Sequence, residues 1–360
     1  MNKLSEFWSH PGIPLITHLK YVANISKEIY NETFIRNANR QLFFDISQLL
    51  ALGHDFGKFS TFFQDYIRNV NDQLALEKLR RERNKILKNY NNIPLYNNLK
   101  DHSKISAFFT YFLVKELLLL KYPQIKENFE IKYLPLISFL VVKKHHGNIQ
   151  NFDSDLRKDL FLEGRKRGYE QYFNILLEHI DLKMIAPFYE EHTKLKGIGS
   201  QIINFKKNFM DYYNSLQSDY ESFDSYLSKN FDIELEDISE NYQLSKELYV
   251  KELYYFLFLE LLYSILLDSD KKEASKTSYI KPTLIYNNIV NDYVKNKFSK
   301  TNGGMNILRD KFYSAINTIA EAPNLNKNIF SITVPTGLGK TLASFNFAVQ
   351  IMNKIKLENN

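Results

Sequence analysis

The sequence predicts a mainly α-helical domain over residues 1–275, followed by the beginning of an α/β nucleotide-binding unit. Apolar residues recur at intervals of three and four over long stretches, which is the spacing of a buried helix face. Glycine and proline are few, 12 and 9 among 360 residues, which favours long helices over turn-rich sheet. Near the end, an apolar run, a glycine-rich loop and an amphipathic segment follow one another, the order of a strand, a phosphate loop and a helix.

The first two predicted helices carry polar residues of unusual type. The first spans Pro14 to Tyr30 and places His18 on the same face as four apolar residues, Leu15, Val22, Ile25 and Ile29. The second is expected from about Asp45 to Phe56-Gly57, where Gly57 would take the left-handed conformation that closes a helix. His54 and Asp55 are therefore expected on its last turn.

Three further apolar helices are predicted, at Ser103 to Leu120, Tyr133 to Val142 and Glu247 to Leu267. The middle one ends in Lys143-Lys144-His145-His146-Gly147, with Gly147 again in the capping position. The last one carries Asp268-Ser269-Asp270 at its carboxyl end. Like the first two helices, these place histidines or aspartates at or beside a helix end.

Two polar stretches, about residues 65–100 and 150–240, interrupt this pattern and are interpreted as insertions of helices and loops. The first carries a basic run, Lys78, Arg80, Arg81, Arg83, Lys85 and Lys88. Exposed helices and phosphate-contacting surfaces share this composition, so the run is equally consistent with either.

Residues 276–360 are predicted to form a linker and the start of the second unit. Phe330 to Val334 is expected to be a short buried strand, followed by the loop Val334 to Thr341, VPTGLGKT. An amphipathic helix follows with an apolar face formed by Leu342, Phe345, Val349 and Met352.

The composition limits the possible chemistry. Lys and Arg outnumber Asp and Glu by 47 to 41, giving a net charge of +6, which suits an anionic partner without establishing one. The absence of cysteine excludes disulfides, thiolate zinc sites and iron–sulfur clusters, and leaves nitrogen and oxygen ligands for any metal. No apolar stretch reaches the roughly 20 residues that span a bilayer, and no secretory signal is evident, so a cytoplasmic protein without a membrane partner is expected.

Histidines and carboxylates recur in an order that suggests one metal site. Imidazole nitrogens and carboxylate oxygens suit borderline divalent metals, and helix ends that converge can direct several of them into one cavity. Any single histidine on an apolar face, such as His18, is more often a hydrogen-bonded structural residue. His10, His179 and His192 lack this context and are interpreted as structural or surface residues. The ordered set comprises His18, His54, Asp55, Lys58, His102, His145, His146, Asp268 and Asp270.

This set resembles the HD superfamily of metallophosphohydrolases. The similarity is closer to the nuclease domain of the CRISPR-associated HD nuclease-helicase of type I systems, over roughly residues 1–275. It is carried by four segments: FWSHPGIPLITHLKYVANIS, LALGHDFGKFSTFFQDYI, KKHHG and LLYSILLDSDKKEA. The resemblance implies an HD helical bundle.

The resemblance also implies roles for individual residues. One or two divalent transition metals, such as Mn, Fe, Co or Ni, would be bound, with Asp55 bridging them. The ligands would be His18, His54, Asp55, His102, His145, His146 and a late aspartate. Asp270 fits the family pattern better than Asp268, which is the second choice. Lys58 would contribute positive charge toward the scissile phosphate, as a catalytic group beside Asp55 and not as a ligand. Taken alone, Lys58 would be interpreted as a solvated charge at a helix end.

The loop VPTGLGKT resembles motif I of superfamily 2 helicases, although Val334 replaces the first glycine of the strict phosphate-loop pattern. The resemblance implies the start of a RecA-like helicase domain that binds ATP and Mg²⁺ through Thr336, Gly337, Gly339, Lys340 and Thr341. The chain ends about twenty residues later, before any downstream acidic box or arginine finger, so we expect ATPase and helicase activity to be incomplete in this sequence.

The function implied by the resemblance is metal-dependent cleavage of single-stranded DNA in CRISPR interference, after recruitment to an RNA-guided surveillance complex. In full-length relatives a helicase motor would feed the strand. Two alternatives stay open: an HD phosphohydrolase acting on nucleotides or cyclic dinucleotides, and a non-catalytic remnant that binds DNA or the complex.

Overall fold

The chain divides into two compact units, Met1–Tyr279 and Ile280–Asn360, which are considered separately. The computed structural model describes residues 2–33, 39–88, 101–124, 128–149, 155–156, 166–231, 242–277, 280, 285–298, 303–321 and 330–358. None of the helices within these ranges is long and apolar enough to cross a bilayer.

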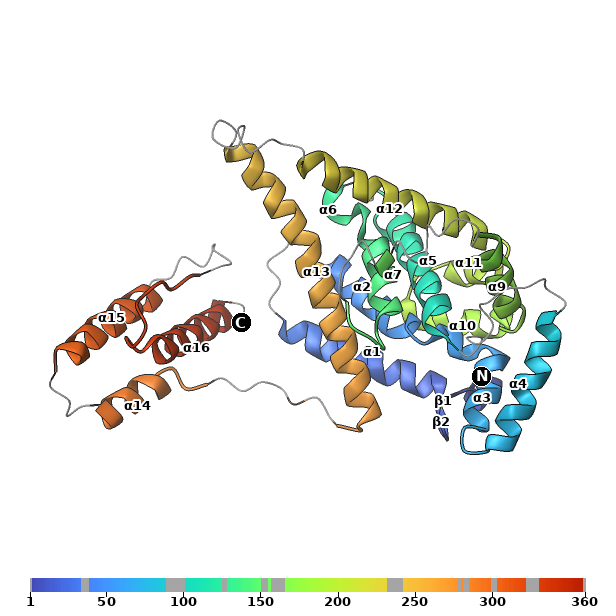
Figure 1. Ribbon diagram of the computed structural model, residues 1–360, viewed down its shortest axis with the longest axis horizontal. Helices are drawn as coiled ribbons and strands as arrows, with labels where there is room; N and C mark the ends of the chain where they lie inside the picture. Colours follow the sequence, from blue (N-terminus) through green and yellow to red (C-terminus); the bar gives the residue numbers. More distant parts are fainter. Residues whose placement is uncertain are drawn as a thin grey trace. The chain divides into compact units, whose positions relative to one another are not determined.

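The first unit is almost entirely helical, which confirms the mainly α prediction (Figure 1). Its only sheet among the described residues is a two-stranded antiparallel hairpin, in which Trp8 pairs with Pro14 and His10 with Ile13 around Gly12, whose φ is 78°. The elements are η1 (Asn2–Glu6), β1 (Trp8–His10), β2 (Ile13–Pro14), α1 (Leu15–Glu32), α2 (Arg40–Gly53), η2 (Phe56–Phe59), α3 (Thr61–Arg68), α4 (Gln73–Lys88), α5 (Ser103–Lys121), α6 (Phe129–Lys132), α7 (Leu134–Lys143), α9 (Lys166–Glu178), α10 (Leu182–Thr193), α11 (Ile198–Asn204), α12 (Phe209–Phe231) and α13 (Tyr242–Ala274).

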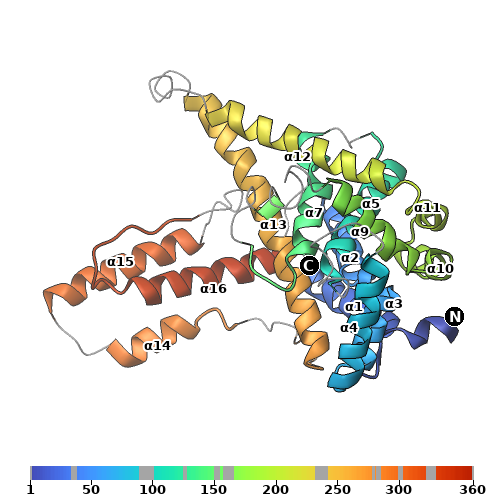
Figure 2. The same cartoon turned by 45° about the vertical axis from the view of Figure 1, so that its right-hand side comes forward.

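The helices α1, α2, α5, α7 and α13 surround one hydrophobic core. The long helix α13, drawn in orange, packs against α1, α2 and α7 (Figures 1 and 2). Aromatic side chains fill much of this core: Phe56 is fully buried and stacks on Phe109 of α5, with ring centroids 3.7 Å apart. This stacking fixes the segment after α2 against α5.

Several predicted helix ends were wrong. The second helix begins at Arg40 instead of Asp45 and ends at Gly53, so His54 and Asp55 lie in the turn that follows it. Neither Gly57 nor Gly147 has the positive φ predicted for a capping glycine. The last helix of the unit continues through Asp268 and Asp270 to Ala274, because its buried residues extend past Leu267.

The stretches predicted as insertions contain helices of their own. In the first, α4 exposes Lys78, Arg80, Arg81 and Lys85, whereas the half-buried Arg83 packs its guanidinium over the Phe62 ring at 5.6 Å. In the second, α9 to α12 pack against the core. Residues 89–100, 150–154, 157–165 and 232–241 of these stretches lie outside the described residues.

The second unit consists, in its described part, of α14 (Ile289–Phe298), α15 (Gly304–Glu321) and α16 (Lys340–Glu358). Its small core centres on Ile316, Ala320, Ala343 and Phe347. The helix predicted after the phosphate loop is confirmed as α16, although Phe345 is 50% exposed instead of buried. The predicted strand at Phe330 to Val334 was wrong: the segment has no regular secondary structure, its residues are exposed or half-buried, and no strand lies in the described part of this unit to bond with it.

Candidate metal centre

Helix α1 supplies a histidine that is held by a carboxylate from the other end of the unit. His18 is completely buried at the contact between α1 and α13. Its Nδ1 lies 2.6 Å from Oε2 of Glu273, so this nitrogen donates to the carboxylate and the ring orientation is fixed. Its Nε2 then points toward Nε2 of His54 at 3.3 Å and Oδ2 of Asp55 at 3.1 Å.

The turn after α2 presents the His54 and Asp55 side chains to the same point. The last helical hydrogen bond runs from the His54 amide to the Leu50 carbonyl, at 2.9 Å. The His54 ring donates from Nδ1 to the Ala51 carbonyl at 2.9 Å, which leaves the Nε2 lone pair free to bind an ion. Asp55 is 1% exposed, and both its oxygens face histidines.

Gly57 allows α5 to approach this turn closely. A Cβ at Gly57 would lie 2.4 Å from Cγ2 of Ile105 and 2.7 Å from the His102 carbonyl, so no other residue fits without a shift of the backbone. The Gly57 amide also donates to Oγ of Ser106, at 2.9 Å. The close approach brings His102, just before α5, to 3.0 Å from Oδ1 of Asp55.

The chain after α7 contributes two histidines on the same side of Asp55. His145 is buried and donates from Nδ1 to the Val142 carbonyl, at 2.5 Å, so its Nε2 faces Oδ1 of Asp55 at 3.7 Å. His146 is exposed, and its Nε2 lies 2.9 Å from Nε2 of His102. Two ring nitrogens at this distance share one proton or one cation.

Of the two late aspartates, only Asp270 belongs to the cluster. Its Oδ1 lies 3.5 Å from Nε2 of His18 and 3.6 Å from Nε2 of His54. Because residues two apart on an α-helix differ by about 200° in direction, Asp268 points elsewhere: it is 46% exposed and pairs with Lys272. The geometry therefore separates two candidates that the sequence left open.

The donor atoms form two groups, and Asp55 belongs to the first and lies beside the second. In each group, every residue offers one ligand atom, and these atoms lie within 4.8 Å of one another. The first group is Asp55, His102, His145 and His146, and the second is His18, His54 and Asp270. Oδ1 of Asp55 lies in the first group, and its Oδ2 lies 3.1 Å from His18 and 3.5 Å from His54 of the second. A carboxylate placed in this way is suited to bridge two ions.

One buried ring nitrogen in this cluster, Nε2 of His145, has no hydrogen-bond partner, and Oδ1 of Asp55 lies 3.7 Å from it. A buried polar atom without a partner is costly, and a divalent cation would satisfy this nitrogen. With only imidazole and carboxylate donors, the cluster fits a divalent metal ion.

Several residues of the cluster are held in the protonation state that binds a metal ion, which is neutral for histidine and ionised for aspartate. Burial lowers the pKa of His102 to about 4, even though the Asp55 carboxylate opposes this shift. His146 is exposed as a residue but partly shielded from solvent at its ring, and this shielding, with the neighbouring His145 and His102, lowers the pKa of His146 to about 3. Burial would raise the pKa of Asp55, but Lys58 and the histidines around it hold that pKa well below its usual range.

His18 differs from these neutral rings. Burial alone would lower its pKa, but hydrogen bonds with Asp55 and Glu273 outweigh burial and raise it to about 9. Without a metal, His18 therefore carries a proton that an ion would have to displace.

Lys58 is a buried partner of Asp55. Its side chain is 6% exposed, and its Nζ lies 2.7 Å from Oδ2 of Asp55 and 3.4 Å from the Ser9 carbonyl. The Phe63 ring, with its centroid 5.4 Å from Nζ, covers it from another side. The interpretation of Lys58 as a solvated charge at a helix end was wrong.

Two residues near the cluster were missed in the sequence. Glu273 holds His18, and one signal could have found it: it lies three residues after Asp270 on a helix, and therefore on the same face. His10, interpreted as structural or surface, lies with His18 and Glu273 in a third group of possible ligands. His179 contacts Thr61, and His192 lines a separate cavity; neither belongs to any of the three groups.

In the second unit, the predicted phosphate loop has the backbone that its glycines allow. Gly337 and Gly339 have φ of 88° and 80°, and α16 begins directly afterwards at Lys340. Arg309 of α15 donates from Nε to the Gly337 carbonyl at 2.7 Å. The side chains of Thr336, Lys340 and Thr341 are exposed, and a cavity of about 310 Å³ adjoins the loop.

Comparison with known families matches residues 5–195 to the family described as Cas3, HD domain. No curated protein and no solved structure matches the chain. The matched range contains His18, His54, Asp55, His102, His145 and His146, and it ends before Asp270 and the second unit.

Proposed function

The chain belongs to the Cas3 HD-domain family, and from this membership we propose that its histidine–aspartate cluster hydrolyses phosphodiester bonds in single-stranded DNA during CRISPR interference. Membership itself indicates a metal-dependent nuclease of a CRISPR system. The observation that carries the finer proposal is the position of Asp55 between two groups of imidazole and carboxylate donors.

Hydrolysis of a phosphodiester requires an activated water and positive charge at the phosphate, and a metal-loaded cluster would supply both. Bound divalent ions would lower the pKa of a water nucleophile and neutralise charge on the phosphoryl and leaving oxygens. The chain's part is to hold the donor atoms: His54 and His145 are oriented by backbone carbonyls and His18 by Glu273. Such supporting hydrogen bonds fix which ring nitrogen remains free.

The exposed edge of the cluster indicates how a substrate phosphate would approach. His18, His54 and His145 are almost or completely buried, whereas His146 is exposed and the Asp270 side chain is 19% exposed. A strand would therefore meet the centre between α13 and the segment after α7. Lys58 lies on the buried side of the cluster. There it would stabilise the ionised Asp55 carboxylate and add positive electrostatic potential for the phosphate.

We also propose that residues 280–360 are the start of a helicase domain whose Lys340 and Thr341 bind ATP and Mg²⁺. The left-handed glycines before α16 and the adjoining cavity support this proposal. In full-length relatives this motor would deliver the strand to the nuclease, with an RNA-guided surveillance complex as the partner.

The test compares cleavage of a long single strand with hydrolysis of mononucleotides and cyclic dinucleotides, in Mn²⁺, Co²⁺ or Ni²⁺. We expect strand cleavage that is lost in Asp55→Ala and His54→Ala and kept in Asp268→Ala, the matched control outside the cluster. Hydrolysis of nucleotides without strand cleavage would indicate an HD phosphohydrolase instead. Strand binding without any hydrolysis would indicate a non-catalytic protein.

A further inference from the structure

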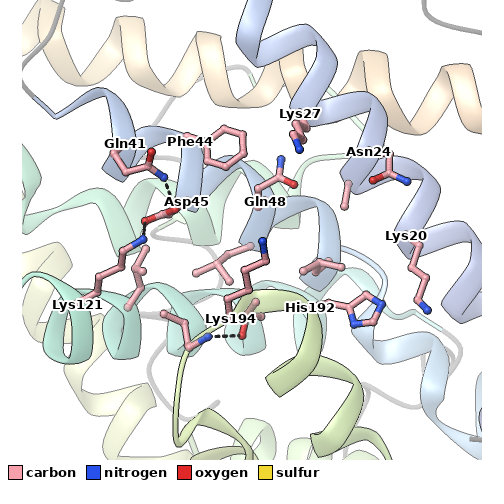
Figure 3. Close-up of a pocket in the computed structure, with 16 residues that line it drawn as sticks. Lys20, Asn24, Lys27, Gln41, Phe44, Asp45, Gln48, Lys121, His192 and Lys194 are labelled. Carbon is pink, nitrogen blue, oxygen red and sulfur yellow. Dashed lines mark hydrogen bonds and ion pairs between the residues drawn. The ribbon is translucent and has the colours of Figure 1, made fainter.

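A second cavity of the first unit, separate from the histidine–aspartate cluster, has the character of an anion site. It encloses about 520 Å³ between α1, α2, the end of α5 and the turn from α10 to α11 (Figure 3). On α1 it is lined by Lys20, Asn24 and Lys27, whereas His18 of the same helix faces the cluster.

The charges around this cavity are unbalanced. Four lysines line it, Lys20, Lys27, Lys121 and Lys194, against one carboxylate, that of Asp45. Asp45 is already satisfied: Lys121 lies 2.5 Å from its Oδ2, and the Tyr122 hydroxyl donates to the same oxygen at 2.8 Å. Lys20, Lys27 and Lys194 have no carboxylate partner among the described residues.

The cavity wall is fixed in a way that presents one of these lysines. Lys194 has a left-handed backbone with φ of 56°, a conformation that favours Gly or Asn over other residues. A lysine here keeps a strained backbone while placing its charge at the cavity, where Figure 3 shows it extending toward Gln48. Next to it, burial and the charge of Lys20 lower the pKa of His192, whose Nδ1 is buried without a hydrogen-bond partner.

The wall formed by α2 has a different chemistry. The half-buried ring of Phe44 and the amides of Gln41 and Gln48 line the cavity there, and the Gln41 amide donates to Oδ1 of Asp45 at 2.8 Å (Figure 3). Gln48 makes only a long hydrogen bond, 3.5 Å, to Ser26. An aromatic ring beside amide groups is suited to a nucleobase, and a cavity of this volume is in the usual range for small-molecule sites.

We propose that this cavity binds a mononucleotide, with its phosphate at Lys20, Lys27 and Lys194 and its base beside Phe44 and Gln48. The proposal does not depend on the activity of the metal centre. Enclosure by four helical segments favours a small ligand over a continuous strand.

The test measures binding of deoxyadenosine 5′-monophosphate by isothermal titration calorimetry to the full chain carrying Lys340→Ala, in EDTA. This background removes the phosphate-loop lysine and any metal, so that binding there does not contribute. We expect Lys20→Gln combined with Lys194→Asn to weaken binding by at least about tenfold, because hydrogen bonds to a charged group are lost. Lys194→Asn relieves the left-handed backbone, and melting curves check that the variant is folded. Lys85→Gln, an exposed lysine of α4, is the matched control and should bind as the parent does.

Inorganic phosphate and a short single-stranded oligonucleotide serve as further probes. Phosphate should bind more weakly than the nucleotide, and Phe44→Leu should reduce the nucleotide's advantage. The proposal is overturned if the nucleotide does not bind, or if the lysine variant binds it unchanged. It is also overturned if phosphate alone binds equally well, or if the oligonucleotide binds more tightly through the same lysines.

Discussion

The metal cluster and the phosphate loop are built in opposite ways. The cluster draws Asp55, His102, His145 and Asp270 from four separate parts of the chain, and its histidines and Asp55 are mostly buried against a large aromatic core. The loop is one continuous segment whose side chains are exposed, and the core behind it is small. A site of the first kind depends on the fold, and a site of the second kind depends mainly on its own backbone.

The largest expected difference between the two regions is in stability. Phe56→Ala removes a fully buried ring that stacks on Phe109, so it should lower the free energy of unfolding of the first unit by about 3–5 kcal/mol. Phe345→Ala, in the half-exposed position on α16, should change the free energy of unfolding of the second unit by less than about 0.5 kcal/mol. Urea unfolding followed by the fluorescence of the single tryptophan, Trp8, reports on the first unit, and the helical circular dichroism signal reports on both units. Equal effects of both changes would contradict the comparison.

Within the cluster, Asp270→Ala should weaken metal binding more than about a hundredfold, the upper range for loss of a residue that only supports a ligand. Asp268→Ala, two residues away and exposed, should leave the affinity unchanged. Titration with Mn²⁺ followed by electron paramagnetic resonance measures both. If Asp268→Ala has the larger effect, the placement of α13 is wrong.

Glu273→Gln should have a smaller effect, about 10- to 100-fold in metal affinity, because the amide holds the His18 ring less firmly than the carboxylate. The melting temperature should change little in the same variant. Glu260→Gln, also on α13 but exposed, provides the control. Unchanged affinity in Glu273→Gln would show that this hydrogen bond does not orient the ligand.

The smallest expected effect is the release of a proton when the metal binds. Because the pKa of His18 is raised to about 9, this ring is protonated at pH 7.5 in the metal-free protein and must become neutral to bind an ion. Metal binding should therefore release about one proton at pH 7.5 and less above pH 9, and affinity should rise with pH over this interval. Calorimetry in buffers of different ionisation enthalpy measures the proton count, and His18→Gln should abolish its pH dependence.

The sequence indicated which histidines and aspartates lie together better than it predicted the local structure around them. The helical class followed from apolar spacing, and the order of histidines and aspartates identified the family. The glycine caps at Gly57 and Gly147 were wrong because a glycine can also serve close packing, as Gly57 does against Ile105. The strand at Phe330 to Val334 was wrong because strands require hydrogen-bonded neighbours that local sequence does not reveal.

The role of Glu273 and the choice between Asp268 and Asp270 required three-dimensional information. Both depend on how far α13 extends and which face it turns to α1, and helix ends are the least certain part of a pattern-based prediction. The cavity beside Lys194 likewise joins α1 and α2 to a turn more than a hundred residues away. No spacing in the sequence indicates that contact.

The central claim is that Asp55 bridges two divalent ions, and a crystal soaked in Mn²⁺ tests it most directly. Anomalous scattering should show two peaks, one beside each oxygen of Asp55, the first toward His102 and His145 and the second toward His18 and Asp270. Both peaks should be absent from a crystal of Asp55→Ala soaked in the same way. Manganese peaks elsewhere, with none in coordination distance of Asp55 in the wild type, would contradict the account.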